Sequence, residues 1–239
     1  ISKSAQDGLL CDGLDGDEQS PITLFSGNTF TDNLNYPISA LGSIATKLDG
    51  TGSVYTGNTY NKILLRGGLL QGANVWTKLS VPYYVNATVS VGYSSTVGNL
   101  TIEPGTTVQF GSDAGLTVGQ YSATSWMKII GDASNRITLT GETALPGSWK
   151  GIAFQCTNTN NRVSYTDVSY GGGSSFTGNP SELGNILAGA WSGGSFTIDN
   201  TSITNSAAYG IYVTLPSPTI SVPGSVTYSG NASGNYFEE

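Results

Sequence analysis

Apolar residues recur at alternate positions in short runs along this chain, and a turn signal closes each run. The clearest stretch is residues 99–119, NLTIEPGTTVQFGSDAGLTVG, in which Pro104-Gly105 and the segment 111–115 supply the turns. Side chains two residues apart in a strand point to the same face, so each apolar pair predicts one short strand with one apolar face. The residues predicted to point inward are Leu100, Ile102, Val108, Phe110, Leu116 and Val118.

Strands this short, with no helical pattern between them, are typical of a parallel β-solenoid. A single coil cannot bury its own apolar face and must stack on the next coil. The same alternation predicts that Thr101 and Thr117 face outward, and that an acidic replacement of Thr117 would be tolerated. The apolar pattern continues after Gly119 and reaches Val226, so the whole fold is expected to be all-β.

We expect residues 21–239 to form one β-helix domain, preceded by residues 1–20 as an acidic leader or the end of a preceding unit. The beginning of the chain lacks a signal-peptide pattern, which favours a processed segment of a longer protein. The segment 171–185, GGGSSFTGNPSELGN, breaks the apolar pattern and is predicted to be a loop excursion. Long loops on a rigid scaffold often carry binding sites.

Charged residues make up only 10% of the chain, against 33 glycines and many Ser, Thr and Asn residues. This balance is typical of exported β-proteins, and we expect a secreted or cell-surface location. The net charge of −7 and the scattering of nine basic residues argue against a nucleic-acid partner. No apolar run approaches the length of a membrane span.

The run CDGLDGDE near the start of the chain separates carboxylates by glycines, as oxygen-ligand calcium loops do. Asp12, Asp15 and Asp17 are therefore candidate calcium ligands, and no other cofactor is expected. The alternative is a solvated acidic leader, because charge runs are usually solvated. Cys11 and Cys156 would form a disulfide only if they meet in an oxidising compartment, which the sequence leaves open.

Four aromatic residues are candidate ligand-binding groups, because aromatic rings can stack on sugars. They are Trp149, Trp191, Tyr209 and Tyr212. The alternative is that Trp149 and Tyr212 fill the core, where large aromatics usually lie. A Thr-x-Thr pattern, which would suit an ordered lattice ligand, occurs at Thr138–Thr140 but is too sparse along the chain to support that function.

Catalytic constellations are hard to assemble from this sequence. It contains no histidine, which excludes a Ser-His nucleophile pair, and two cysteines alone do not make a zinc site. Arg162 with Asp167, and Lys150 after Trp149, are candidate charged groups, although each charge could simply be solvated or cap a coil edge. A glycosidase would need two facing carboxylates, and nothing selects a pair from the available acids. These acids are Glu103, Asp113, Asp132, Glu142, Asp167 and Asp199.

Four segments carry a family resemblance that runs from about residue 63 to residue 237. They are LTIEPGTTVQF (100–110), NRITLTG (135–141), GSWKGIAF (147–154) and SITNSAAYGIYV (202–213). In this order the chain resembles right-handed parallel β-helix repeat proteins of the pectate-lyase-like superfamily, in a non-enzymatic branch of secreted and surface-attached bacterial proteins. The resemblance implies a right-handed parallel β-helix.

The resemblance also sets the functional expectation. It implies a structural or adhesive repeat module without catalysis, with a polysaccharide or another surface protein as partner and glycan binding among its roles. The alternative is a divergent polysaccharide lyase or glycoside hydrolase acting on acidic polysaccharide. The Asn-Thr-Asp, Gly-His-Gly and Arg-Ile-Lys segments of polygalacturonase-like hydrolases do not occur in this chain.

Overall fold

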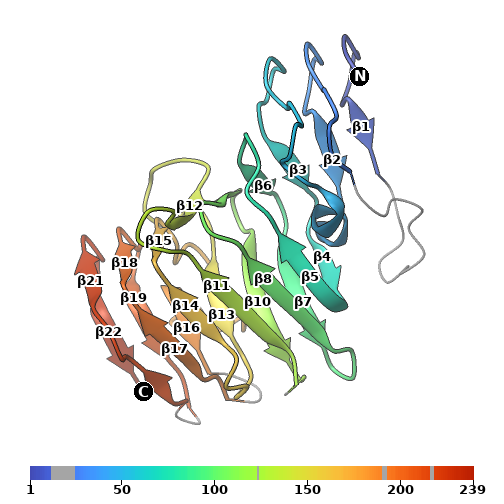
Figure 1. Cartoon of the computed structure of the whole chain (residues 1–239). Coiled ribbons are helices and arrows are strands. Elements are labelled where there is room, and N and C mark those ends of the chain that lie inside the picture. Colours follow the sequence, from blue (N-terminus) through green and yellow to red (C-terminus); the bar gives the residue numbers. More distant parts are fainter. Residues whose placement is uncertain (12–24, 123, 190–192, 216–217) are drawn as a thin grey trace.

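The computed structural model describes residues 1–11, 25–122, 124–189, 193–215 and 218–239. Its strands form three parallel sheets that wrap around one core, and the described residues contain a single helical element, the 3₁₀ helix η1 (Gly42–Lys47). Figure 1 shows the strands stacked in successive coils from the N-terminus to the C-terminus. The predicted all-β parallel β-helix is confirmed.

The nine-stranded sheet runs through the whole described length of the molecule. In order it contains β1 (Leu9–Leu10), β2 (Ile38–Ala40), β3 (Ile63–Leu65), β6 (Tyr83–Val85), β9 (Thr107–Phe110), β12 (Ile137–Gly141), β15 (Thr166–Ser169), β18 (Thr201–Thr204) and β21 (Val226–Ser229).

Two shorter sheets complete the coils from β4 onward. The seven-stranded sheet contains β4 (Gly68–Leu70), β7 (Val89–Tyr93), β10 (Gly115–Gln120), β13 (Gly151–Phe154), β16 (Gly184–Ala188), β19 (Tyr209–Val213) and β22 (Gly234–Glu238). The six-stranded sheet contains β5 (Gly72–Trp76), β8 (Gly98–Ile102), β11 (Trp126–Ile130), β14 (Arg162–Ser164), β17 (Phe196–Asp199) and β20 (Ile220–Ser221).

From β3 onward the chain visits the three sheets in rotation, so each strand pairs with the strand three places later in the sequence, whereas β1, β2 and β3 pair consecutively. In the nine-stranded sheet, for example, Val108 pairs with Leu139, which pairs with Val168, which pairs with Ile203. These side chains form one inward column. The six residues predicted to point inward between positions 99 and 119 are all 0% exposed, which confirms the predicted face.

Sharp corners between sheets use single residues in the left-handed backbone region. Tyr165 (φ 45°) and Asn200 (φ 46°) occupy equivalent places where the six-stranded sheet passes into the nine-stranded sheet. Tyr170 (φ 67°) and Asn205 (φ 54°) do the same at the next corner. A tyrosine or an asparagine, instead of a glycine, adopts this conformation at these four corners, at some cost in backbone strain.

Buried asparagines tie successive coils together. The Asn161 Oδ1 atom accepts a hydrogen bond from the Met127 backbone N–H of the preceding coil at 2.9 Å. Its Nδ2 atom donates to the Ser195 carbonyl of the next coil at 3.1 Å. Asn33 and Asn58 make a similar link near the N-terminus, with 2.7 Å between Asn33 Nδ2 and Asn58 Oδ1. Such bonds satisfy backbone groups that a corner removes from the sheet ladders.

The N-terminal and C-terminal ends of the β-helix are closed by different elements. At the N-terminal side, η1 packs on β4 and β5, and its residue Ala45 is fully buried. In the last coil, Tyr228, Tyr236 and Glu238 take the places that Ile203, Ile211 and Val213 occupy one coil earlier. The inward columns therefore end on amphipathic and charged side chains, a common protection of open sheet edges.

The predicted excursion lies between β15 and β16 and covers the outer face of the seven-stranded sheet. Its Phe176 ring lies directly over Gly115, where an added Cβ atom would come within 2.6 Å of the ring. Ser174 donates a hydrogen bond to Asp113 at 2.5 Å, and Lys150 forms an ion pair with the same carboxylate at 3.4 Å.

The structure overturns the prediction for Thr117. Thr117 points away from the core as expected, but it is only 4% exposed because the outer face of this sheet is itself covered. Its hydroxyl donates to Gln155 Oε1 at 2.7 Å. An acidic side chain at this position would therefore be buried, and the expectation of tolerance was wrong.

Candidate functional site

Two recesses lie on the outer surface of the C-terminal coils. The first, which we call the corner groove, follows the corner between the six- and nine-stranded sheets and has a volume of about 350 Å³. It is lined by Arg136, Tyr165, Asp167, Asn200, Thr201, Ser202, Ser225 and Thr227.

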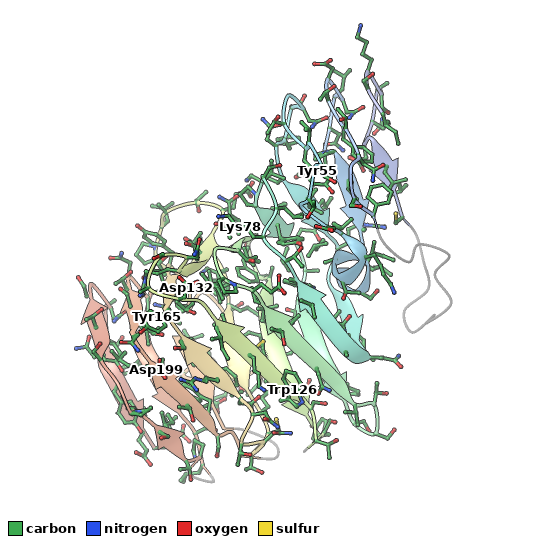
Figure 2. The ribbon with its side chains drawn as sticks, in the orientation of Figure 1. Tyr55, Lys78, Trp126, Asp132, Tyr165 and Asp199 are labelled. Atoms are coloured by element: carbon green, nitrogen blue, oxygen red, sulfur yellow. The ribbon has the colours of Figure 1, made fainter. Side chains whose placement is uncertain are left out.

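The strand register explains why these residues meet. Asp167 pairs with Ser202, which pairs with Thr227, so three outward side chains from successive coils form one column on the nine-stranded sheet. Tyr165 and Asn200 stand at the adjoining corner, in the left-handed conformation described above. Figure 2 shows Tyr165 and Asp199 on neighbouring C-terminal coils.

Arg136 is the most extensively bonded side chain of the corner groove. Its Nε atom lies 3.1 and 3.0 Å from the two carboxylate oxygens of Asp167, and its Nη2 atom lies 2.7 Å from Oδ1. The remaining bonds run to the carbonyls of Asn200 (2.9 Å, from Nη1) and Thr166 (3.0 Å, from Nη2). The hydrogen bond to Asp167 raises the pKa of Arg136. A guanidinium held in this way is a rigid, fully charged group.

A second Arg–Asp pair lies beside the corner groove. Arg162 Nη2 is 2.7 Å from Asp199 Oδ2, and the Asp199 side chain is only 6% exposed. Burial alone would raise the pKa of Asp199, but hydrogen bonds from Ser164 and Asn200 and the charge of Arg162 lower it overall. The pairing of Arg162 with Asp167 considered from the sequence is therefore wrong, because each arginine pairs with an aspartate one coil further on.

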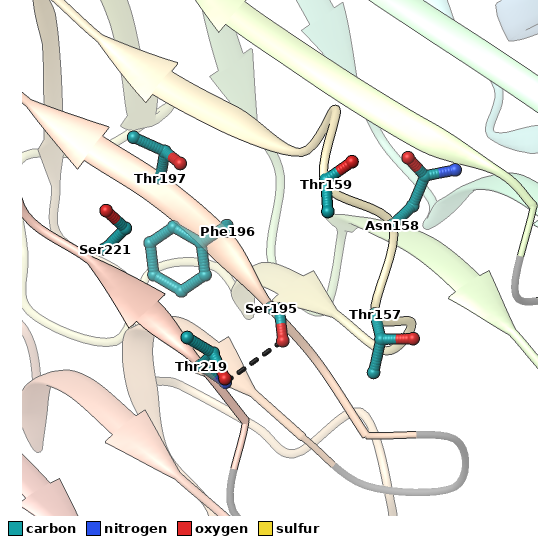
Figure 3. A pocket seen from close by; sticks show the side chains of 8 residues that line it. All are labelled: Thr157, Asn158, Thr159, Ser195, Phe196, Thr197, Thr219 and Ser221. Atoms are coloured by element: carbon teal, nitrogen blue, oxygen red, sulfur yellow. Dashed lines mark hydrogen bonds between the residues drawn. The ribbon is translucent and has the colours of Figure 1, made fainter.

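The second recess, the hydroxyl pocket, lies on the six-stranded sheet and has a volume of about 400 Å³. Figure 3 shows its side chains and the hydrogen bond between Ser195 and Thr219, in which the Thr219 backbone N–H donates to Ser195 Oγ at 3.0 Å. The lining residues are Thr157, Asn158, Thr159, Ser195, Phe196, Thr197, Thr219 and Ser221, and none of them is charged.

The hydroxyl pocket and the corner groove lie along the same strands. Thr197, in the pocket, pairs with Arg162 of the preceding coil. Asn200, in the groove, follows Thr197 by three positions, which corresponds to about 10 Å along an extended chain. The two recesses therefore share the coil that contains β17, and Arg162, which bonds Asp199, lies next to Thr197 in the adjacent coil.

The aromatic candidates predicted from the sequence lie elsewhere. Trp149 is 0% exposed, stacks on Phe110 with 4.1 Å between ring centroids, and donates from Nε1 to the Ser169 carbonyl at 2.8 Å. Its ring is part of the core, the alternative considered above. Trp191 lies outside the described residues, as do Asp12, Asp15 and Asp17. No cluster of metal-binding side chains occurs within the described ranges.

Tyr209 and Tyr212 are brought together on the outer face of the seven-stranded sheet. Their ring centroids are 5.6 Å apart, and each lies 5.0 Å from the Phe237 ring. The Tyr212 hydroxyl donates to Glu239 Oε1 at 2.9 Å, and burial together with this carboxylate raises its pKa to about 12. Tyr212 is 3% exposed, so its contacts are chiefly with the protein itself. A ligand-binding role for the pair stays a prediction.

Cys156 is a buried thiol with no disulfide bond to Cys11. Its Sγ atom donates to the Ser125 carbonyl at 3.2 Å, and burial raises its pKa. Buried thiols of this kind behave as small packing groups. The sequence left open whether Cys11 and Cys156 form a disulfide, and in this structure they do not.

Sequence reasoning missed the corner groove because its residues come from four successive coils. Asp167 was one acid among six, and Arg136 was one of the scattered basic residues. The available signal was the alternation itself, which places Asp167, Ser202 and Thr227 on outward positions of their strands. Only the register between coils shows that these positions are neighbours.

None of the helical segments that the structure describes is long and apolar enough to cross a membrane. Comparison of the chain with protein-family models, with curated proteins and with solved structures found no match. The parallel β-helix is therefore supported by the strand pairing of this chain alone, and the superfamily resemblance stays an expectation.

Proposed function

We propose that this chain is a non-catalytic carbohydrate-binding β-helix module, with the corner groove as its binding site. The observation that carries the proposal is the lining of the groove. It combines a rigid Arg136–Asp167 pair, the amide of Asn200 and the ring of Tyr165 in a recess of about 350 Å³. Pockets of this size with a few convergent polar groups are the usual form of small-ligand sites.

Sugar hydroxyls both donate and accept hydrogen bonds, so a sugar site needs donors and acceptors at fixed positions. Asp167 offers acceptor oxygens, with its side chain 41% exposed, while Arg136 holds it in place. Ser202 and Thr227 add hydroxyls that can do either. Because these groups project from paired strands, little side-chain freedom is lost when a ligand binds.

The absence of catalysis in this proposal follows from the state of the nearby acids. A glycosidase needs a carboxylic acid whose pKa is raised so that it can protonate the leaving group. Asp199 has a lowered pKa, and Asp167 is held in a bidentate contact with Arg136. The Asp199 carboxylate is therefore a poor proton donor at neutral pH, and the oxygens of Asp167 are already engaged by Arg136.

The proposal also places the protein outside the cell, secreted or attached to a cell surface, as a structural or adhesive element. Its low charge content and its many Ser, Thr and Asn residues support this location. An elongated helix that presents a binding groove on its side would connect a surface to a polysaccharide.

A matched pair of substitutions on one strand tests the binding site. Thr227 lines the corner groove, and Ser229 is an exposed outward residue two positions along the same strand β21. On a glycan array, the wild-type protein should bind at least one carbohydrate, Thr227→Trp should lose that binding because the indole fills the groove, and Ser229→Trp should keep it. Equal loss in both variants, or binding by neither protein nor variants, would refute the proposal.

A separate assay addresses the alternative of a divergent lyase. The wild-type protein is incubated with pectin and with alginate, and the release of unsaturated uronate is followed by ultraviolet absorbance. No release is expected. Turnover that disappears in a carboxylate variant such as Asp167→Asn would replace the binding function by a catalytic one.

A further inference from the structure

We infer that the corner groove selects an uncharged sugar and discriminates against acidic polysaccharides. This inference rests on the proposed carbohydrate-binding function and adds the class of ligand. It follows from the charge balance of the groove and its surroundings, in which each arginine is already neutralised by an aspartate of the protein.

Arg136 has almost no capacity left for an anion. A guanidinium carries five N–H donors, and those of Arg136 reach both oxygens of Asp167 and the carbonyls of Thr166 and Asn200. An incoming carboxylate would have to displace Asp167, which is fixed on strand β15. A neutral hydroxyl needs only the outer lone pairs of Asp167 and one remaining donor.

Arg162 is neutralised in the same manner. Its partner Asp199 is buried in a hydrogen-bonded site with Ser164 and Asn200, so this anion does not move away when a ligand approaches. The positive charges of the two guanidinium groups are therefore balanced by the negative charges of the two carboxylates. The other side chains that line the corner groove carry no charge.

A negative ligand would also meet repulsion. The Asp167 side chain is 41% exposed and faces the groove, so a uronate or sulfate group bound there would lie close to a like charge. Desolvating two like charges beside each other is unfavourable. A sugar with hydroxyls alone avoids this penalty.

The hydroxyl pocket supports the same ligand class independently. All of its lining residues are uncharged, and four of them are threonines. Because it adjoins Arg162 through the pairing with Thr197, a neutral oligosaccharide could contact both recesses along strand β17. An extended anionic polymer would find no counter-charge in the pocket.

Lys128 is the nearby cation that an acidic ligand would use. It pairs in register with Arg162 on the six-stranded sheet, and its Nζ atom lies 4.7 Å from the Trp126 ring centroid, outside the lining of both recesses. If acidic polymers were the true ligands, removing this charge should weaken their binding. If the ligand is neutral, Lys128→Met should leave binding unchanged.

The test measures retention of the protein on two sets of soluble polysaccharides in affinity gels. The neutral set is arabinoxylan, galactomannan and mixed-linkage β-glucan, and the acidic set is polygalacturonate, alginate and heparan sulfate. Each is used at about 20 mM and about 500 mM NaCl, because screening separates ionic from neutral binding. We expect retention by a neutral polymer that changes less than about twofold with salt and is lost in Thr227→Trp.

The substitution Asp167→Asn gives a second readout of the same inference. It removes the charge that neutralises Arg136 and preserves the shape of the side chain. The variant should gain salt-sensitive retention by acidic polymers, while Ser202→Ala should not. Thermal unfolding of both variants shows that they are folded before they are compared.

The outcomes separate the inference from the function on which it rests. Wild-type retention by an acidic polymer that is lost at high salt and in Lys128→Met would overturn the neutral class and leave carbohydrate binding intact. A gain of acidic binding by Asp167→Asn, with neutral binding by the wild type, would support the inference. Retention by no polymer of either set would overturn the proposed function itself.

Discussion

The outer face of the nine-stranded sheet has two chemically different regions on one continuous backbone. Near the N-terminus, Tyr36 stacks on Tyr60 and Tyr84, with 4.8 and 6.2 Å between ring centroids, and Lys62 pairs with Glu142 at 3.0 Å. In the C-terminal coils the outward positions carry an Arg–Asp pair and hydroxyls. The outward residues of the latter strands are Asp167, Ser169, Ser202, Thr204, Thr227 and Ser229.

The two regions differ in what their surface groups contact. The tyrosine rings of the first region lie face to face, so they use one another as stacking partners and stabilise neighbouring coils. The hydroxyls and the carboxylate of the second region point into a recess and remain available to a ligand. Because the inward columns hold both regions on the same core, the outward positions can differ freely.

The largest effect is expected where the core under both regions is disturbed. Phe110 is fully buried and stacks on Trp149, so Phe110→Ala should leave a cavity and lower the free energy of unfolding by about 3–5 kcal/mol. Thr101→Ala, at a half-buried outward position, should cost well under about 1 kcal/mol. Urea denaturation measures both. Hydrogen exchange should show lost protection in the coils on either side, and uniform loss along the chain would contradict a solenoid.

The next effect tests the covered outer face of the seven-stranded sheet. Thr117→Asp buries a carboxylate on this covered face and should cost about 2–4 kcal/mol in free energy of unfolding. Thr101→Asp, also outward but half-buried on an uncovered sheet, is the matched control and should cost less than about 1 kcal/mol. Equal costs would mean that Thr117 is not shielded from water in solution.

A smaller effect is expected at the Arg162–Asp199 pair of the C-terminal region. Asp199→Asn weakens charge-assisted hydrogen bonds and should lower the free energy of unfolding by about 1–2 kcal/mol at pH 7. The pKa of Asp199 is lowered in the folded state, so its stabilisation is present above the unfolded-state pKa of about 4 and is lost as the pH falls below it.

The stability gap between the wild type and Asp199→Asn should therefore narrow between about pH 4 and pH 2. Denaturation curves across this range measure the gap. A gap that stays constant down to about pH 2 would show that the aspartate acts through packing and not through its charge.

The smallest effect separates the aromatic region from the binding region. Tyr60 is 46% exposed and contributes one ring to the stack, so Tyr60→Ser should cost about 0.5–1 kcal/mol and leave carbohydrate binding unchanged. Thr227→Trp should abolish carbohydrate binding and leave the free energy of unfolding nearly unchanged, because Thr227 is exposed. Calorimetric melting and affinity gels on both variants measure this difference. Loss of binding in Tyr60→Ser would place the ligand on the tyrosine stack instead.

Much of the fold could be predicted from the sequence because alternation is a local property. The inward face of residues 99–119 needed only the two-residue period of a strand, and the excursion near residue 171 needed only the loss of that period. The corners were harder. Tyr165 and Asn200 each turn the chain in the left-handed backbone region. A glycine in the sequence would have indicated such a turn, but a tyrosine or an asparagine does not do so clearly.

The sequence by itself determined which side chains face inward, and the tertiary structure decided which outward side chains are neighbours. Arg136 meets Asp167, and Arg162 meets Asp199, because strands pair with the next coil and the turns between them differ in length. Sequence distance therefore does not specify the contacts. The same cause placed Trp149 in the core and buried Thr117 under residues from another coil. Burial depends on what packs against a position, and that is settled only when the coils stack.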